Sequence, residues 1–402
     1  MASKSLADFT LTAFVCFTLF GCGGNSNSSS TGGGGSASTS EMLYASAPVS
    51  LLAFRVDPSS AKLTLSQTGP PDGSVSQTLD NPPIVVSMAA SKYLYTINPN
   101  ANGIDAYSMT SDGTLTPVAG SPFLVPQNVI SNPELSSLMN VPSGKFLFAL
   151  DASGGILQAQ TDPSTGSVTY TSLSPSFGFL VRSAAIDPTG KSIYISVGSA
   201  GFTQTGDYAG IAALSLDPTT GQVSSAAGSP SQLASNSQPC QVTVTPSGRF
   251  VYASLNNADA IAAYVRDSTT SSLSPVAGSP FPTPRASSQT CYLAVHPSGK
   301  FLYALNLNGH DITGYAIDST SGALTPLPGS PFASQTTPDV FKDPFTQGPM
   351  AIDPSGQFLF VLTTETYIAV YGIDQNSGVL KVSGSPRPVP QTLSSLNIFN
   401  VK

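Results

Sequence analysis

Residues 291–332 read CYLAVHPSGKFLYALNLNGHDITGYAIDSTSGALTPLPGSPF, and the architecture of the chain can be worked out from them. This stretch holds four short apolar runs, at residues 291–296, 301–305, 311–317 and 323–327. Gly, Pro, Asp and Ser separate the runs, most plainly in the turn Pro297-Ser-Gly299. Turn residues at both ends of short apolar runs are typical of β-strands. The stretch therefore predicts a unit of four strands.

The same unit recurs along the chain, because three sequence markers keep one register. A strand-like segment such as Ile312-Thr-Gly-Tyr315 begins at residues 51, 104, 156, 211, 261, 312 and 368. Gly-Ser-Pro-Phe or a variant of it begins at residues 120, 174, 228, 278, 329 and 384. Pro-Ser-Gly or Pro-Thr-Gly begins at residues 142, 188, 246, 297 and 354. Four-stranded units of about 50 residues in seven copies predict an all-β fold, a seven-bladed β-propeller.

The two ends of the repeat array predict how the ring closes. The first copy starts at a second strand, around Leu43-Tyr44, with no Pro-Ser-Gly turn before it. The segment 395–401 is strand-like and has no second strand after it. We expect this C-terminal segment to supply the first strand of the first blade, which would remove an exposed sheet edge.

The first forty residues differ from the repeats and predict export. The apolar run from Phe9 to Phe20 is too short to span a bilayer and has the length of a signal-peptide core. It ends in Leu19-Phe20-Gly21-Cys22, which resembles a bacterial lipobox; an ordinary secretory signal is the alternative. We therefore expect a signal peptide over 1–21, a lipidated Cys22 with a Gly/Ser-rich tether over 22–41, and the propeller over 42–402. The expected location is the cell envelope, in the periplasm or on the cell surface.

Composition limits the possible partners. Only 9% of the residues are charged and the net charge is −7, whereas proteins that bind nucleic acid carry basic patches. The chain has two His, neither beside a Cys, so we expect no metal site and no cofactor. The expected state is a monomer with a lipid anchor, whose partner is a small-molecule ligand or an envelope protein.

The recurring residues also resemble those of a known family. The pattern is Pro-Ser-Gly-Lys/Arg/Gln-Phe, then Ile-x-x-Tyr-x-Ile-Asp, Gly-x-Leu and Gly-Ser-Pro-Phe. Over residues 42–402 it resembles the seven-bladed lactonase-type propellers, which include one class of 6-phosphogluconolactonases and a fungal muconate-lactonizing enzyme. The resemblance implies hydrolysis of a small lactone by His, Arg and Glu around the channel mouth. Gln238-Pro-Cys240 and Gln289-Thr-Cys291 stand where the family has a Pro-His lead-in to the first strand. That departure favours the alternative function, a non-catalytic binding or scaffold propeller at the membrane.

Lactone hydrolysis needs a base for water, a group that polarises the carbonyl and a holder for the anion. In a propeller these groups belong on the irregular loops of one face, between the second and third strands and between successive blades. His310 or Glu365 would be the base, and Arg285 the anion holder and carbonyl polariser. Arg182 and Arg387 are further substrate-binding candidates. The alternative is that these are isolated charges on wet loops.

Two of the four cysteines, Cys16 and Cys22, belong to the expected signal peptide and lipid anchor. The other two cysteines have two interpretations. Cys240 and Cys291 hold equivalent positions in neighbouring repeats, each seven residues before the Ser of its Pro-Ser-Gly turn. In an oxidising compartment they would form a disulfide, provided that their Cα atoms lie within roughly 7 Å. Otherwise they are two buried thiols.

Overall fold

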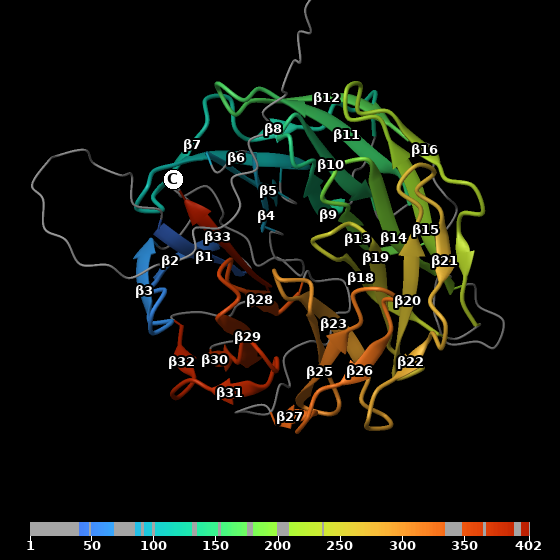
Figure 1. Cartoon of the computed structure of the whole chain (residues 1–402). Coiled ribbons are helices and arrows are strands. Elements are labelled where there is room, and N and C mark those ends of the chain that lie inside the picture. Colours follow the sequence, from blue (N-terminus) through green and yellow to red (C-terminus); the bar gives the residue numbers. More distant parts are fainter. Residues whose placement is uncertain are drawn as a thin grey trace, which may run out of the picture. The chain divides into compact units, whose positions relative to one another are not determined.

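The computed structural model describes residues 40–47, 50–67, 85–89, 92–98, 101–130, 135–151, 154–174, 180–198, 209–234, 237–333, 348–364, 367–389 and 395–401. All regular elements in these ranges are β-strands, and they form seven antiparallel sheets. The sheets are the blades of a propeller within the compact unit that spans Ser38–Lys402 (Figure 1). The predicted all-β, seven-bladed fold is confirmed.

Blades 2 to 7 are each a run of consecutive strands. Blade 2 has β4 (Val85–Ala89), β5 (Tyr93–Asn98), β6 (Gly103–Met109), β7 (Leu115–Pro117) and β8 (Phe123–Leu124). Blade 3 has β9 (Leu135–Asn140), β10 (Phe146–Asp151), β11 (Ile156–Thr161) and β12 (Val168–Leu173). Blade 4 has β13 (Leu180–Ile186), β14 (Ser192–Gly198), β15 (Ala209–Leu216), β16 (Val223–Ser225) and β17 (Ser231–Gln232).

The second half of the ring repeats this order. Blade 5 has β18 (Pro239–Val244), β19 (Phe250–Leu255), β20 (Ala260–Arg266), β21 (Leu273–Pro275) and β22 (Phe281–Pro282). Blade 6 has β23 (Thr290–Val295), β24 (Phe301–Asn306), β25 (Asp311–Ile317), β26 (Leu324–Pro326) and β27 (Phe332–Ala333). Blade 7 has β28 (Met350–Ile352), β29 (Phe358–Thr364), β30 (Tyr367–Ile373), β31 (Leu380–Val382) and β32 (Arg387–Pro388).

Blade 1 is built from both ends of the repeat array. It contains β1 (Ser40–Ala47), β2 (Ser50–Val56), β3 (Leu63–Gln67) and β33 (Ser395–Val401), in the order β3-β2-β1-β33. The antiparallel register runs from Ser40 opposite Val401 to Ser46 opposite Ser395. The predicted closure of the ring by the C-terminal strand is confirmed.

A short fifth strand is the main feature that the repeat pattern did not reveal. The strands β8, β17, β22, β27 and β32 each pair with the third strand of their own blade. The Ser of the Gly-Ser-Pro marker prepares this pairing, because its hydroxyl oxygen accepts a hydrogen bond from the third strand. The Ala263 amide lies 2.8 Å from Ser279 Oγ, and the Gly314 amide lies 2.9 Å from Ser330 Oγ. The marker is therefore a return turn that brings the chain back against the third strand.

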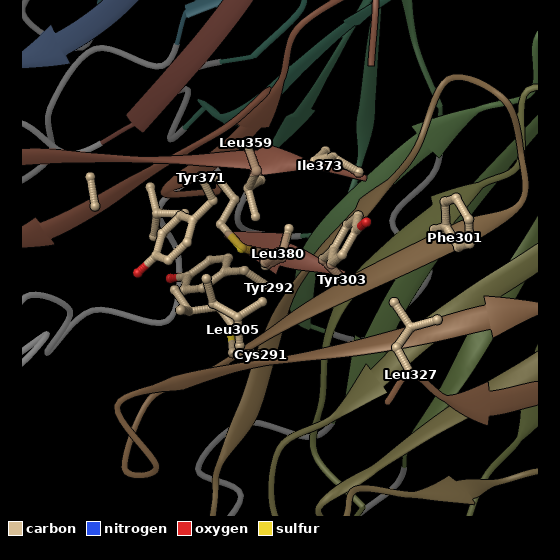
Figure 2. Packing of buried hydrophobic residues seen from close by; sticks show 14 of the residues in the cluster. Cys291, Tyr292, Phe301, Tyr303, Leu305, Leu327, Leu359, Tyr371, Ile373 and Leu380 are labelled. Atoms are coloured by element: carbon tan, nitrogen blue, oxygen red, sulfur yellow. The ribbon is translucent and has the colours of Figure 1, made fainter. Parts of the chain in front are cut away.

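Apolar side chains between adjacent blades form the core. One cluster joins blades 5, 6 and 7 and includes Cys240, Tyr292 and Tyr371; Figure 2 shows Cys291 and Tyr292 among its aliphatic members. Tyrosines of the second strands also hold neighbouring blades together. Tyr252 and Tyr303 donate hydrogen bonds to backbone carbonyls one blade onward, those of Gly322 (2.9 Å) and Gly378 (2.7 Å).

The residue before each Pro-Ser-Gly or Pro-Thr-Gly turn is buried, and in blades 4 and 6 it also joins neighbouring blades. His296 makes one ring contact to Ser298 Oγ (2.7 Å) and another to the carbonyl of Gly356 in blade 7 (2.8 Å). Burial lowers the pKa of His296, so the neutral ring, with Nε2 as donor to the carbonyl, fits this position. In blade 4 the same position holds Asp187, which forms a buried ion pair with Arg266 of blade 5.

Candidate functional site: an axial cavity

The first strands of the blades face the centre of the ring (Figure 1). Near their N-terminal ends they enclose a cavity of about 160 Å³. Its lining comes from five blades and consists of Arg182, Ser183, Ala184, Cys240, Gln241, Tyr292, Gly348, Met350, Leu396 and Asn397. These first strands begin on the face of the irregular loops, so the cavity lies on the side where sequence analysis places the site.

β-Bulges aim the side chains at this height. The register skips Arg182 between Val181 and Ser183, and it skips Cys291 between Thr290 and Tyr292. In β18 the irregularity falls between Pro239 and Val242. A bulge leaves one residue out of the ladder and turns its side chain away from the regular alternation. Arg182 lines the cavity at one of these bulges, and Tyr292, the first residue paired after Cys291, lines it at another.

Gln241 links two blades in the cavity wall. Its Oε1 accepts a hydrogen bond of 2.6 Å from the backbone amide of Leu293 in blade 6. Its own backbone amide donates to Ser254 Oγ at 3.0 Å. With the carbonyl oxygen engaged, the remaining hydrogen-bonding group of the side chain is its NH₂. That nitrogen lies close to Gly348, at the start of blade 7, about 3.8 Å from the position that a Cβ would occupy there.

The disulfide Cys240–Cys291 braces the same wall. The two Cα atoms are 5.2 Å apart and the bridge joins β18 to β23. Cys240 lines the cavity and Cys291 precedes Tyr292, which also lines it. Of the two interpretations that the sequence leaves open, the structure has the disulfide.

The lining is rich in hydrogen-bond donors. Arg182 supplies a guanidinium, Gln241 and Asn397 supply amides, and Tyr292 supplies a phenol. Among the lining residues that the structure describes, none is a carboxylate or an imidazole. The cavity is therefore suited to hold a carbonyl oxygen or an anion, while a base for water would have to come from the surrounding loops.

Two of the predicted catalytic residues lie together, at the variable-loop end of blade 6. The Arg285 guanidinium forms an ion pair with Asp311 (3.2 Å) and donates to the Gly309 carbonyl at 3.1 Å. Its side chain is 59% exposed, whereas that of Asp311 is 6% exposed. His310 has a positive φ of 52°, and its buried Nδ1 has no hydrogen-bond partner. Neither Arg285 nor His310 is among the residues that line the axial cavity.

Asp311 also anchors a buried polar network that the sequence analysis did not foresee. Asn306 donates to Asp311 Oδ1 (2.6 Å) and to Thr313 Oγ1 (2.7 Å), and its own Oδ1 accepts from Thr290 at 2.8 Å. In blade 5 the corresponding pair of strand ends is Leu255 and Ala260, which are apolar. Arg285 is thus held by a structural carboxylate, and its predicted role as anion holder would require it to leave or share that partner.

The remaining predicted residues have separate positions. Arg182 lines the cavity, as required of a substrate-binding residue. Arg387 does not: it lies on β32, between blades 7 and 1. Glu365 and Cys22 lie outside the described residues. Gln241, Tyr292 and Asn397 were missed, although counting back four residues from the position before the Pro-Ser-Gly turn finds Gln241 and Tyr292.

Within the part of the chain that the structure describes, no helix has the length and apolar character needed to cross a membrane. The same residues contain no group of three or more His, Cys, Asp or Glu side chains arranged to hold a metal ion.

Comparisons with known proteins agree with the fold. Residues 209–338 match the profile of a family described as lactonase, 7-bladed beta-propeller. No curated protein sequence matches the chain.

Similar solved structures include two putative 6-phosphogluconolactonases, from Bacteroides uniformis and Bacteroides fragilis. They are 15% and 16% identical, with TM-scores of 0.66 and 0.67, and each alignment covers 90% of this chain and 99% or 98% of the other. The periplasmic gluconolactonase of Pseudomonas aeruginosa is 16% identical, with a TM-score of 0.67, over 91% of this chain and 100% of that one. The chain is thus a seven-bladed propeller that is similar in fold to proteins named gluconolactonase, and its residues 209–338 are similar to the lactonase propeller family.

Proposed function

We propose that the chain is a lactonase, which binds a small lactone in the axial cavity and hydrolyses its ester bond. The observation that carries this proposal is the convergence of the Arg182 guanidinium and the Gln241 amide on one cavity at the propeller axis. The family profile that matches residues 209–338 supports the same reaction class. The volume of about 160 Å³ is below the roughly 300–1,000 Å³ typical of drug-sized sites and so favours a small ligand.

The chemistry of the lining fits the two ends of this reaction. Water adds to the lactone carbonyl carbon, the ring C–O bond breaks, and the product is a hydroxy acid. Arg182 would stabilise the negative charge that develops on the carbonyl oxygen and then the product carboxylate, because a guanidinium pairs with both oxygens of a carboxylate. Gln241 would add a neutral donor from the adjacent blade. His310 or Glu365, on the loops, remains the candidate base.

A second candidate function is ligand binding without catalysis. The observation that favours it is the lack of a carboxylate or imidazole among the described lining residues. In that case a sugar acid or another small anion would bind Arg182 and would not be converted.

The test is a hydrolysis assay over a panel of five- and six-membered lactones, with binding followed by calorimetry. We expect Arg182→Gln to lower kcat/KM at least tenfold, because a charge-assisted hydrogen bond contributes about 1.5–3 kcal/mol. Arg55→Gln is the matched control, since Arg55 is exposed on β2, and it should leave the rate unchanged. Hydrolysis that is insensitive to Arg182→Gln would contradict the proposed site. Binding that depends on Arg182, without turnover of any lactone, would support the second candidate.

We also propose that the protein is exported and anchored by a lipid on Cys22. The support is the apolar run before Leu19-Phe20-Gly21-Cys22 and the Gly/Ser-rich stretch after it. The full chain expressed in a bacterial host should partition into the detergent phase of Triton X-114, and Cys22→Ser should move it to the aqueous phase. Equal partitioning of the two proteins would rule out lipidation.

A further inference from the structure

A second hollow lies away from the axis, between blades 7 and 1. It has a volume of about 390 Å³ and is lined by Phe54, Leu63, Leu65, Arg387, Pro388 and Val389. β2 and β3 of blade 1 form one wall and β32 of blade 7 forms the other (Figure 1). Apart from Arg387, the lining side chains are all apolar.

The equivalent place between blades 2 and 3 is filled by aromatic rings. There Phe123 pairs with Ile104 of the third strand, as Arg387 pairs with Ile368. Tyr170 pairs with Ala159, as Leu65 pairs with Phe54. Phe123 and Tyr170 pack against one apolar cluster, and the Tyr170 hydroxyl donates to the Phe123 carbonyl at 2.7 Å. At the hollow, Arg387 stands where three other blades have Phe. The position of Leu65 varies among the blades, with Tyr in blade 3 and Pro at residues 117, 275 and 326.

Arg387 places a positive charge in this apolar hollow, with no carboxylate partner among the described residues. Its Nε is buried and has no hydrogen-bond partner. The ion pairs among the described residues are Arg266–Asp187 and Arg285–Asp311, so no described carboxylate neutralises Arg387. A buried guanidinium donor is costly unless it meets an acceptor, and an anion is the acceptor that it pairs with best. Nothing in the repeat requires an arginine here, because three other blades place Phe at this position, at residues 123, 281 and 332.

We propose that this hollow, defined by Leu65 and Arg387, binds a small anionic amphiphile: a carboxylate or phosphate carried on an aliphatic chain. The acid group pairs with the Arg387 guanidinium, and the aliphatic chain covers Leu63 and Leu65. Leu65 is 41% exposed, so the wall offers apolar surface that the fold itself leaves uncovered. An uncharged aliphatic ligand would leave Arg387 Nε without an acceptor. An anion without an aliphatic chain would leave Leu63 and Leu65 exposed to water. Only the combination satisfies both walls.

The site is tested by titration calorimetry on the full chain with octanoate, octyl phosphate and octanol. We expect both anions to bind at least tenfold more tightly than octanol, because the alcohol lacks the charge. Arg387→Phe restores the residue of the other repeats and should abolish binding. Leu65→Tyr introduces the ring that blade 3 has at this position and should weaken binding by occlusion while Arg387 is kept. Arg55→Gln, on the same strand as Phe54, is the control for general positive charge and should change nothing.

A vesicle arm separates the two sources of such a group. Phosphatidylcholine vesicles with and without phosphatidylglycerol are sedimented with the Cys22→Ser protein and with the same protein carrying Arg387→Phe, so that a lipid on Cys22 does not contribute. Sedimentation that requires both the anionic lipid and Arg387 assigns the site to a lipid headgroup, and binding of octanoate alone assigns it to a free acid. Binding of octanol as tight as that of octanoate, octanoate binding that survives Arg387→Phe in a protein with the wild-type melting temperature, or no binding of any probe overturns the proposal.

Discussion

A buried carboxylate and a buried guanidinium face each other between blades 4 and 5. Asp187 and Arg266 are 3.1 Å apart and their side chains are 0% and 4% exposed. Arg266 also donates to the Gly248 carbonyl at 3.0 Å, and Asp187 accepts backbone amides of Lys191 and Ser192 at 2.8 and 2.6 Å. Between blades 3 and 4 the equivalent residues are Val141 and Leu216, which lie in one apolar cluster. The fold thus accepts either an ion pair or an apolar pair at this position.

This alternation predicts strong coupling between the two residues. Arg266→Leu alone should lower the free energy of unfolding by about 3–5 kcal/mol, because it leaves a buried carboxylate without its cation. The double variant Asp187→Val with Arg266→Leu copies the neighbouring blade and should recover most of that loss. Urea unfolding of the two single variants and the double variant measures the coupling. Additive losses in the double variant would contradict the interpretation.

The disulfide joins two neighbouring first strands, β18 and β23. It closes a loop with a sequence separation of 51 residues, for which the chain-entropy relation gives a stabilisation of about 4 kcal/mol. Replacing both cysteines by serine should therefore lower the free energy of unfolding by about 2–4 kcal/mol and weaken any ligand that binds the axial cavity. A reducing agent should reproduce the loss in the wild type and have no effect on the double variant. In a protein with Cys16 and Cys22 replaced by serine, two titratable thiols after unfolding of the oxidised form would show that the bridge does not form.

The strands were largely predictable, because turn residues close in the sequence set their boundaries. Pro-Ser-Gly turns and turns from Asp to Gly mark the strand ends in most four-stranded units. The third strand of blade 6 was predicted over its observed span, Asp311–Ile317. The fifth strand was not, because two residues such as Phe332–Ala333 show no periodicity. Its evidence lay in the Gly-Ser-Pro marker, whose Ser hydroxyl accepts from the third strand. That contact depends on tertiary structure.

The axial site was predictable only in part, for a physical reason. Arg182 could be selected from the sequence because the chain has few charged residues, so each one on a loop is a candidate. Gln241 and Tyr292 are ordinary strand residues by composition, and β-bulges set their exposure to the axis. A shift of one residue reverses the face of a strand, and sequence alternation does not show where such a shift occurs. The partner of Arg285, Asp311, was hidden for a similar reason, since its burial depends on the polar network of blade 6.

The whole ring closes where β1 meets β33, and a buried acid lies in this strand pair, at Glu41 opposite Asn400. Glu41 is 9% exposed, and its Oε2 is buried without a hydrogen-bond partner. Burial, and next the nearby charge of Asp353 in blade 7, raise the pKa of Glu41 to about 7. Its ordinary value is 4.5, so the folded ring holds a proton between about pH 4.5 and 7 that the unfolded chain has released.

The stability of the ring should therefore fall as the pH rises through this window and level off above about pH 7. Glu41→Gln keeps the shape and removes the titration. At pH 8 we expect the free energy of unfolding of the variant, measured with urea, to exceed that of the wild type by about 1–3 kcal/mol. At pH 4 the two proteins should differ little. Asp374→Asn is the matched control, because hydrogen bonds from the Ser377 amide and hydroxyl lower the pKa of that exposed turn carboxyl. Its loss should act in the opposite direction and leave the slope between pH 4.5 and 7 in place. A Glu41→Gln protein with the same slope as the wild type would show that the closure does not carry this proton.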